Sequence, residues 1–286
     1  MLSLHTNNAA LSAQNSISKT QQSLSTSMTR LSTGFRINSA MDDAAGLQIA
    51  TRLKAQTSGM AVAMRNTQNS TSMLATAEGS LDEVTNMIVR MKDLATQAAD
   101  ASSTVADKTA MQSEFDALGT ELNNVLNNTT FGGAKLLVGG TIAGAMTFQI
   151  GASTSEQMTV DLSTQVGTLV TDVTATTANY ATPNTVGTEL TAAGAANTTI
   201  DKLATALASI GTVRSALGAS ANRLEHIYNN LSNISINGKA ATGRIMDVDF
   251  ASESSKMTTN QMLLQAGTAM LKQSNSMSSM VMSLLQ

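Results

Sequence analysis

The feature that most constrains this chain is a long, unbroken helical repeat. Small or apolar residues recur at steps of three or four, at Leu47, Ala50, Leu53, Thr57, Met60, Met64, Thr67, Thr71, Leu74, Ala77, Leu81, Val84, Ile88, Met91, Ala95 and Ala98. This spacing, sustained over about seven heptads, is typical of a coiled-coil seam. At about 1.5 Å per residue, the helix would be on the order of 75 Å long. Because no compact domain of this size holds such a helix, the sequence predicts a rod.

Two further helical seams follow along the chain. After a polar break at 100–107, one seam runs from Met111 to Val125, and the turn-forming residues at 127–133 end it. The other seam runs from Ile200 to Ile234, and Asn237-Gly238 is expected to close it.

The stretch between these two seams changes in character. Residues 147–150 and 157–162 alternate apolar and polar side chains around a turn at 151–156, which predicts a β-hairpin. Residues 163–199 are rich in Thr, Ala, Gly and Asn and contain the only proline, Pro183. We expect this segment to be a low-complexity surface excursion that is too polar to own a core.

Both ends of the chain read as amphipathic helices, one of which stops at Thr33-Gly34. The last one carries a seven-residue repeat at Phe250, Met257, Leu264, Leu271 and Leu285. Neither helix has enough apolar surface to be stable alone, so each needs a partner, either the other end or a second copy of the chain. The predicted self-assembly seam consists of Leu24, Met28, Leu31, Met257, Leu264 and Leu271.

Composition excludes several classes of function. The 286 residues include no Cys, which removes disulfides, thiolate nucleophiles and Cys-based metal sites. Charged residues make up 13% and the net charge is −3, so no footprint for nucleic acid or anionic lipid is present. No apolar run reaches the roughly 18 residues of a membrane span. The start of the chain lacks the features of an ordinary signal peptide, which on its own would predict a cytoplasmic protein.

No catalytic, cofactor or metal site is predicted. His5 and His226 lack partners at ligand spacing and are read as ordinary histidines. The Asp42-Asp43 pair and Asp247-Val248-Asp249 are interpreted as helix-start residues, because aspartate caps a helix and complements its dipole. The Gly pairs at 132–133 and 139–140 are read as turns. The methionines of the seams are read as adaptable packing groups.

Three segments closely resemble the bacterial flagellin family. Residues 31–47, LSTGFRINSAMDDAAGL, resemble its N-terminal signature. Parts of 214–231 resemble its C-terminal helix, and 244–249 with 265–267 resemble its terminal segment. The start, MLSLHTN, and the Met-rich short form are similar to flagellins of lateral or secondary flagellar systems.

The resemblance implies a mainly α fold, an antiparallel helical coiled-coil rod with a small β-hairpin region and little or no outer domain. The N- and C-terminal segments would pair into an inner domain that lines the filament channel. The implied parts are 1–44 and 241–286 for the inner domain, 45–162 and 200–240 for the rod, and 163–199 for a short variable surface segment.

The resemblance also implies the function, which is that of a non-enzymatic subunit that self-assembles into the flagellar filament for swimming or swarming. The chain would leave the cell through the flagellar type III apparatus without a cleaved signal peptide. Its implied partners are further copies of itself, an export chaperone, and cap and junction proteins. A hook–filament junction protein is the alternative, since it shares the terminal architecture. Periodicity alone would favour a cytoplasmic coiled-coil scaffold.

One further resemblance concerns recognition by a host. Residues 89–96, VRMKDLAT, resemble the segment by which many flagellins engage Toll-like receptor 5. The matching receptor-contact positions are Arg90, Leu94 and Glu114. The competing interpretation is that Leu94 only packs and that Arg90 and Glu114 are solvated charges.

Overall fold

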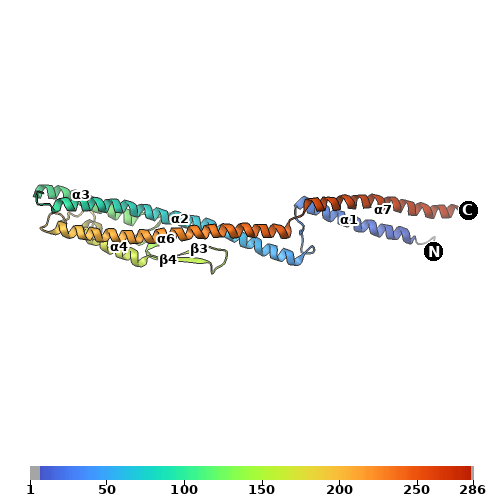
Figure 1. Ribbon diagram of the computed structural model, residues 1–286, viewed down its shortest axis with the longest axis horizontal. Coiled ribbons are helices and arrows are strands. Elements are labelled where there is room, and N and C mark those ends of the chain that lie inside the picture. Colours follow the sequence, from blue (N-terminus) through green and yellow to red (C-terminus); the bar gives the residue numbers. More distant parts are fainter. Residues whose placement is uncertain (1–6, 285–286) are drawn as a thin grey trace. The chain divides into compact units, whose positions relative to one another are not determined.

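The computed structural model describes the backbone of residues 7–284 and the side chains of residues 7–277. His5 and Leu285, which the sequence analysis singled out, lie outside the described residues. The chain divides into two compact units, which are Met1–Gln56 with Ile236–Gln286, and Thr57–Ser235. We call them the terminal unit and the central unit. Two long helices, α2 (Ala44–Ala99) and α6 (Ala195–Met246), contribute residues to both units (Figure 1).

The terminal unit is built on two helices, α1 (Asn8–Thr33) and α7 (Phe250–Leu284), which lie side by side (Figure 1). They are antiparallel, because the start of α1 meets a late turn of α7 and the end of α1 meets its beginning. Asn7 Nδ2 donates a hydrogen bond to the Ser274 carbonyl at 3.2 Å, and Ser27 Oγ donates one to Glu253 Oε1 at 2.6 Å.

The ends of these helices are set by short polar side chains and one glycine. Asn7 caps α1 by accepting a hydrogen bond from the Ala10 N–H at 3.0 Å. Gly34 ends α1 with a left-handed φ of 75°, a conformation that glycine adopts without strain. Asp43 and Asp249 accept hydrogen bonds from the N–H groups that open α2 and α7, which confirms their predicted capping role.

The central unit packs several helices around one apolar core. It contains α3 (Val105–Asn128), α4 (Ser163–Thr176), the part of α2 from Thr57 onward and the part of α6 up to Ser235. Fully buried side chains of α2, α3 and α6 form this core, among them Leu81, Ile88, Phe115, Leu122 and Leu203. Arg214 of α6 joins two carboxylates of α2, with Nη2 2.7 Å from Glu78 Oε1 and 2.9 Å from Asp82 Oδ1.

The predicted β-hairpin is present. Strands β3 (Ala145–Gln149) and β4 (Gln157–Asp161) pair antiparallel, with Met146 opposite Val160 and Phe148 opposite Met158. A smaller pair, β1 (Thr130–Phe131) and β2 (Ala134–Lys135), turns through a Gly pair with positive φ, and the 3₁₀ turn η1 (Thr141–Ala143) follows. The prediction of a mainly helical fold with a small hairpin region is therefore confirmed.

Two expectations were wrong. Helix α6 does not close at Asn237-Gly238 but continues to Met246. A glycine inside a helix costs only about 1 kcal/mol relative to alanine, and helix-forming residues such as Lys239, Ala240 and Ala241 follow this one. Thr242 then donates its hydroxyl back to the Gly238 carbonyl at 2.9 Å, as helical threonines commonly do.

The second correction concerns residues 163–199, which were expected to be a surface excursion too polar to have a core of its own. They form α4 and the single turn α5 (Ala178–Ala181), and they lie within the central unit. Val166, Leu169 and Val173 are buried at helical spacing, and Tyr180 and Leu190 join the same core. Between them lie threonines whose hydroxyls bond to carbonyls one turn back, as Thr168 does to Thr164. Because these polar residues lie between the apolar ones, the helical spacing was not recognised in the sequence.

Candidate functional site

The contact between α1 and α7 is a thin seam with one large apolar residue per heptad on each helix. Half-buried Ile17, Leu24 and Leu31 mark this repeat on α1, and half-buried Met257, Leu264 and Leu271 mark it on α7. Small or polar residues fill the alternate seam positions, namely Ala13, Thr20 and Ser27 on α1 and Glu253, Asn260, Gly267 and Ser274 on α7. The helices come close at Gly267, where an added Cβ would lie 2.9 Å from Ile17 Cγ1.

Five of the six predicted seam residues thus lie between α1 and α7 of one chain. Leu24, Leu31, Met257, Leu264 and Leu271 are half-buried there. Met28 is different, because it is exposed on the outer side of α1. The heptad pattern therefore located a contact within the chain.

Another set of apolar side chains on α7 is exposed. Leu263, Met270 and Met277 follow one another at seven-residue steps, so they form a stripe beside the seam. We call these three residues the outer stripe. Met270 is 69% exposed, and Met262 on the same helix is also largely exposed. The outer stripe was not predicted from the sequence, because it lies one residue before the stronger repeat of Leu264 and Leu271.

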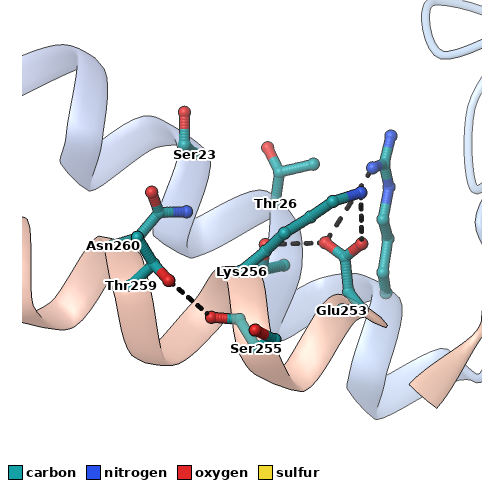
Figure 2. Close-up of a pocket in the computed structure, with 9 residues that line it drawn as sticks. Ser23, Thr26, Glu253, Ser255, Lys256, Thr259 and Asn260 are labelled. Carbon is teal, nitrogen blue, oxygen red and sulfur yellow. Dashed lines mark hydrogen bonds and ion pairs between the residues drawn. The ribbon is translucent and has the colours of Figure 1, made fainter. Parts of the chain in front are cut away.

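One seam position holds a buried carboxylate. Glu253 has only 5% of its side chain exposed, and it accepts the Ser27 hydroxyl at 2.6 Å. Two cations flank it, with Arg30 Nη1 at 3.9 Å from Oε1 and Lys256 Nζ at 3.6 Å from Oε2. These side chains line a cavity of about 440 Å³ between α1 and α7. Figure 2 shows Lys256 and Glu253 on the same helix, α7, with the lysine amine directed at the carboxylate.

This cluster is linked to the loop that joins α1 to α2. Arg30 Nη2 lies 3.8 Å from Asp42 Oδ1. The other oxygen of Asp42 accepts the backbone N–H groups of Ser39 and Asn38 at 2.9 and 3.1 Å, and these hydrogen bonds lower the pKa of Asp42 below its usual value. In this cluster, the cations Arg30 and Lys256 neutralise the carboxylates of Glu253 and Asp42. Across the described residues, no group of three or more His, Cys, Asp or Glu could hold a metal ion.

A second polar network lies in the central unit and was also missed. Buried Gln112 of α3 donates to Asp116 Oδ1 at 2.8 Å and to Glu189 Oε2 at 2.9 Å, and it accepts the Leu190 N–H at 2.7 Å. Asn179, which is fully buried, donates to the same Asp116 oxygen at 2.8 Å. These bonds hold residues 179–190 against α3. The two bonded segments lie far apart along the chain, so no local sequence pattern indicates the network.

The three predicted receptor-contact residues are only partly brought together on the surface. Arg90 and Glu114 form an exposed ion pair between α2 and α3, with Nη2 and Oε1 2.7 Å apart. Leu94 was expected to share the exposed face of Arg90. Instead it is 3% exposed and belongs to the apolar core of the central unit. Its surface role was therefore wrongly predicted.

His226 is exposed on α6. Within residues 7–284, no helix has the length and apolar character needed to cross a membrane.

Comparison with known proteins identifies the family. A family model described as the bacterial flagellin N-terminal helical region matches residues 4–141, and one described as the C-terminal helical region matches 200–285. Flagellin A of Vibrio anguillarum is 35% identical, and Flagellin A of Vibrio cholerae is 32% identical, with all of both chains covered in each case.

A solved structure shares the fold. The structure of a putative flagellar hook-associated protein from Vibrio parahaemolyticus matches with a TM-score of 0.54 at 14% identity, covering 72% of this chain and all of the other. The two family models together span most of the chain, and relatives above 30% identity match it from end to end. The chain belongs to the bacterial flagellin family.

Proposed function

We propose that this flagellin enters its filament through the α1–α7 pair, with the outer stripe as the contact between subunits. Membership of the family makes the chain a structural, non-enzymatic subunit of the bacterial flagellar filament, which lies outside the cell. The observation that carries the proposal is the outer stripe itself. Leu263, Met270 and Met277 are exposed and aligned, although large apolar side chains gain stability when they are buried.

Burial of the outer stripe would supply part of the free energy that polymerisation needs. Complete burial of a Leu or Met side chain is worth about 1.5–3 kcal/mol. Since each residue of the stripe is already partly covered, burial by a neighbour would add about 1 kcal/mol per side chain. Each subunit that joins the filament makes the same gain, because helical assembly repeats one contact.

The seam and the stripe have different roles in this proposal. The seam holds α1 and α7 together within a subunit, and Glu253 with Ser27 and Arg30 sets their register, since a polar group at a seam position is satisfied in one alignment only. The outer stripe then meets a neighbouring subunit. Pairing within the chain therefore prepares the surface that assembles.

A matched pair of substitutions on α7 tests the stripe. Leu263→Asp places a carboxylate on it, whereas Gln265→Asp places the same group one residue beyond the seam on another side of the same helix. We expect Leu263→Asp to abolish seeded polymerisation and Gln265→Asp to polymerise like the wild type. Circular dichroism must show equal helix content in both monomers. Normal filaments from Leu263→Asp would refute the role of the stripe.

The junction alternative is not proposed. Likeness to the hook-associated protein at 14% identity shows the fold alone. The relatives at 31–35% identity over the whole chain are flagellins by name.

We also propose that the monomer is recognised by host Toll-like receptor 5 at Arg90 and Glu114. Both side chains are about half exposed, and their ion pair fixes the guanidinium on the surface. Leu94 would support this surface by packing beneath it.

In a receptor-reporter assay, Arg90→Ala and Glu114→Ala should lower the signal without changing the thermal stability. Leu94→Ala should lower both, since the cavity left by a buried Leu costs about 2–5 kcal/mol. A double variant Arg90→Ala/Glu114→Ala that signals fully would remove this surface from the site.

Further partners follow from membership of the family. We propose an export chaperone, and cap and junction proteins, as binding partners of the helical ends. We propose export by the flagellar type III apparatus without cleavage. Sequencing the N-terminus of filament protein tests this, because a shortened start would contradict it.

A further inference from the structure

Exposed methionines are gathered in one unit of the chain. Among the described side chains, the methionines that are mostly exposed are Met28, Met41, Met262, Met270 and Met277, and all of them belong to the terminal unit. The methionines of the central unit are buried or half-buried, such as Met91 and Met158. If methionine served only as an adaptable packing group, exposed methionines would not be confined to the terminal unit among the described side chains.

The thioether of an exposed methionine is a defined chemical target. Its sulfur attacks one oxygen of hydrogen peroxide, so that an S–O bond forms and the O–O bond breaks. The sulfur is oxidised by two electrons to the sulfoxide, and the peroxide is reduced to water. Because the chain contains no Cys, no thiol competes for the oxidant or forms a disulfide.

We propose that Met270 and Met277 form an oxidation-sensitive site that controls polymerisation, an inference that rests on the proposed role of the outer stripe. A sulfoxide turns a flexible apolar side chain into a polar one. Its oxygen would have to leave water when a neighbouring subunit covers the stripe, and the residues of the stripe offer it no hydrogen-bond donor. Oxidised monomer therefore joins a filament only at a higher monomer concentration.

The same geometry predicts where oxidation does not act. Met91, Met146 and Met158 are buried in the central unit, so peroxide leaves the core of that unit intact. Met270 and Met277 become covered once a subunit has been incorporated, so a finished filament resists the oxidant. Reduction by methionine sulfoxide reductases reverses the modification and restores the ability to polymerise.

The test compares wild type with two double variants of matched size. Met270→Leu/Met277→Leu keeps the stripe apolar at nearly constant volume, so it should polymerise normally before treatment. Met28→Leu/Met41→Leu removes two exposed thioethers outside the stripe. Each monomer is treated with hydrogen peroxide, its sulfoxides are located by peptide mass spectrometry, and its critical concentration for seeded polymerisation is measured.

We expect peroxide to raise the critical concentration of wild type and of Met28→Leu/Met41→Leu roughly tenfold or more. Met270→Leu/Met277→Leu should keep its untreated value, and the two reductases should restore the wild type. The inference is overturned if wild type with sulfoxides at both positions polymerises normally, or if Met270→Leu/Met277→Leu is as sensitive as wild type. These failures differ from failure of the stripe itself, because Leu263→Asp tests the stripe without any oxidant.

Discussion

Removal of the Glu253 carboxylate should loosen the terminal unit by about as much as the loss of one hydrogen bond to a charged group costs. The group is 95% buried in the α1–α7 seam, it accepts the Ser27 hydroxyl at 2.6 Å, and two cations lie within 4 Å of it. Glu253→Ala leaves Ser27 without its acceptor and leaves Arg30 facing Lys256 with no anion between them.

The magnitude follows from these contacts. A hydrogen bond to a charged group contributes about 1.5–3 kcal/mol. The ion pairs add less than a fully buried pair would, because Lys256 is mostly exposed and water screens it. We therefore expect Glu253→Ala to destabilise the α1–α7 pair by about 2 kcal/mol, which is a factor of roughly 30 in its opening equilibrium. Glu253→Gln keeps an acceptor for Ser27 and should lose less than half as much.

Amide hydrogen exchange measures this opening directly. The amides of α1 and α7 should exchange faster in Glu253→Ala, whereas those of α3 in the central unit should not change. Glu225→Gln, which neutralises an exposed carboxylate of α6, is the control and should resemble the wild type. If α1 and α7 exchange in Glu253→Ala as they do in wild type, the carboxylate does not hold the seam together.

Three other outcomes are expected. Limited proteolysis of the monomer should trim the chain before about Asp42 and after about Ile245 while the central unit resists. The terminal helices are weakly held, because the seam carries only one large apolar residue per heptad on each helix. Equal resistance of monomer and filament to trimming would contradict this expectation. Leu271→Asp should be obtained as a monomer that forms no filaments, since it puts an unpaired carboxylate into the seam; filaments of wild-type yield would show that the seam tolerates charge. The lowered pKa of Asp42 contributes stability that is present above the unfolded value of 3.8 and is lost as pH falls through the lower folded value. Asp42→Asn should abolish this part of the acid sensitivity, measured by amide hydrogen exchange of the 38–43 loop as a function of pH. An unchanged pH dependence in Asp42→Asn would argue against this role of the carboxylate.

The helices and the hairpin could be predicted because their signals are local. Seven-residue periodicity marked α2, and the turn glycine Gly34 marked the end of α1. Alternation around a short turn marked β3 and β4. The resemblance of residues 31–47 to the family signature then supplied the function.

The features that could not be predicted depend on distant partners. Val166, Leu169 and Val173 count as core only because the central unit supplies a surface for α4, and threonines lie between them in the sequence. The burial of Glu253 requires Ser27, which is 226 residues away along the chain. Leu94 is turned inward by packing around α2, which a resemblance in residues 89–96 does not reveal.

The outer stripe should become buried between subunits on assembly, and labelling of a single cysteine can detect this burial. Because the chain has no native Cys, Met270→Cys places one thiol on the stripe, and Val186→Cys places one on an exposed loop of the central unit. The rate of reaction with a maleimide is measured for monomer and for filament. We predict that the thiol of Met270→Cys reacts readily in the monomer and is protected at least tenfold in the filament, while that of Val186→Cys reacts alike in both. A filament in which the thiol of Met270→Cys reacts as fast as it does in the monomer would contradict this expectation.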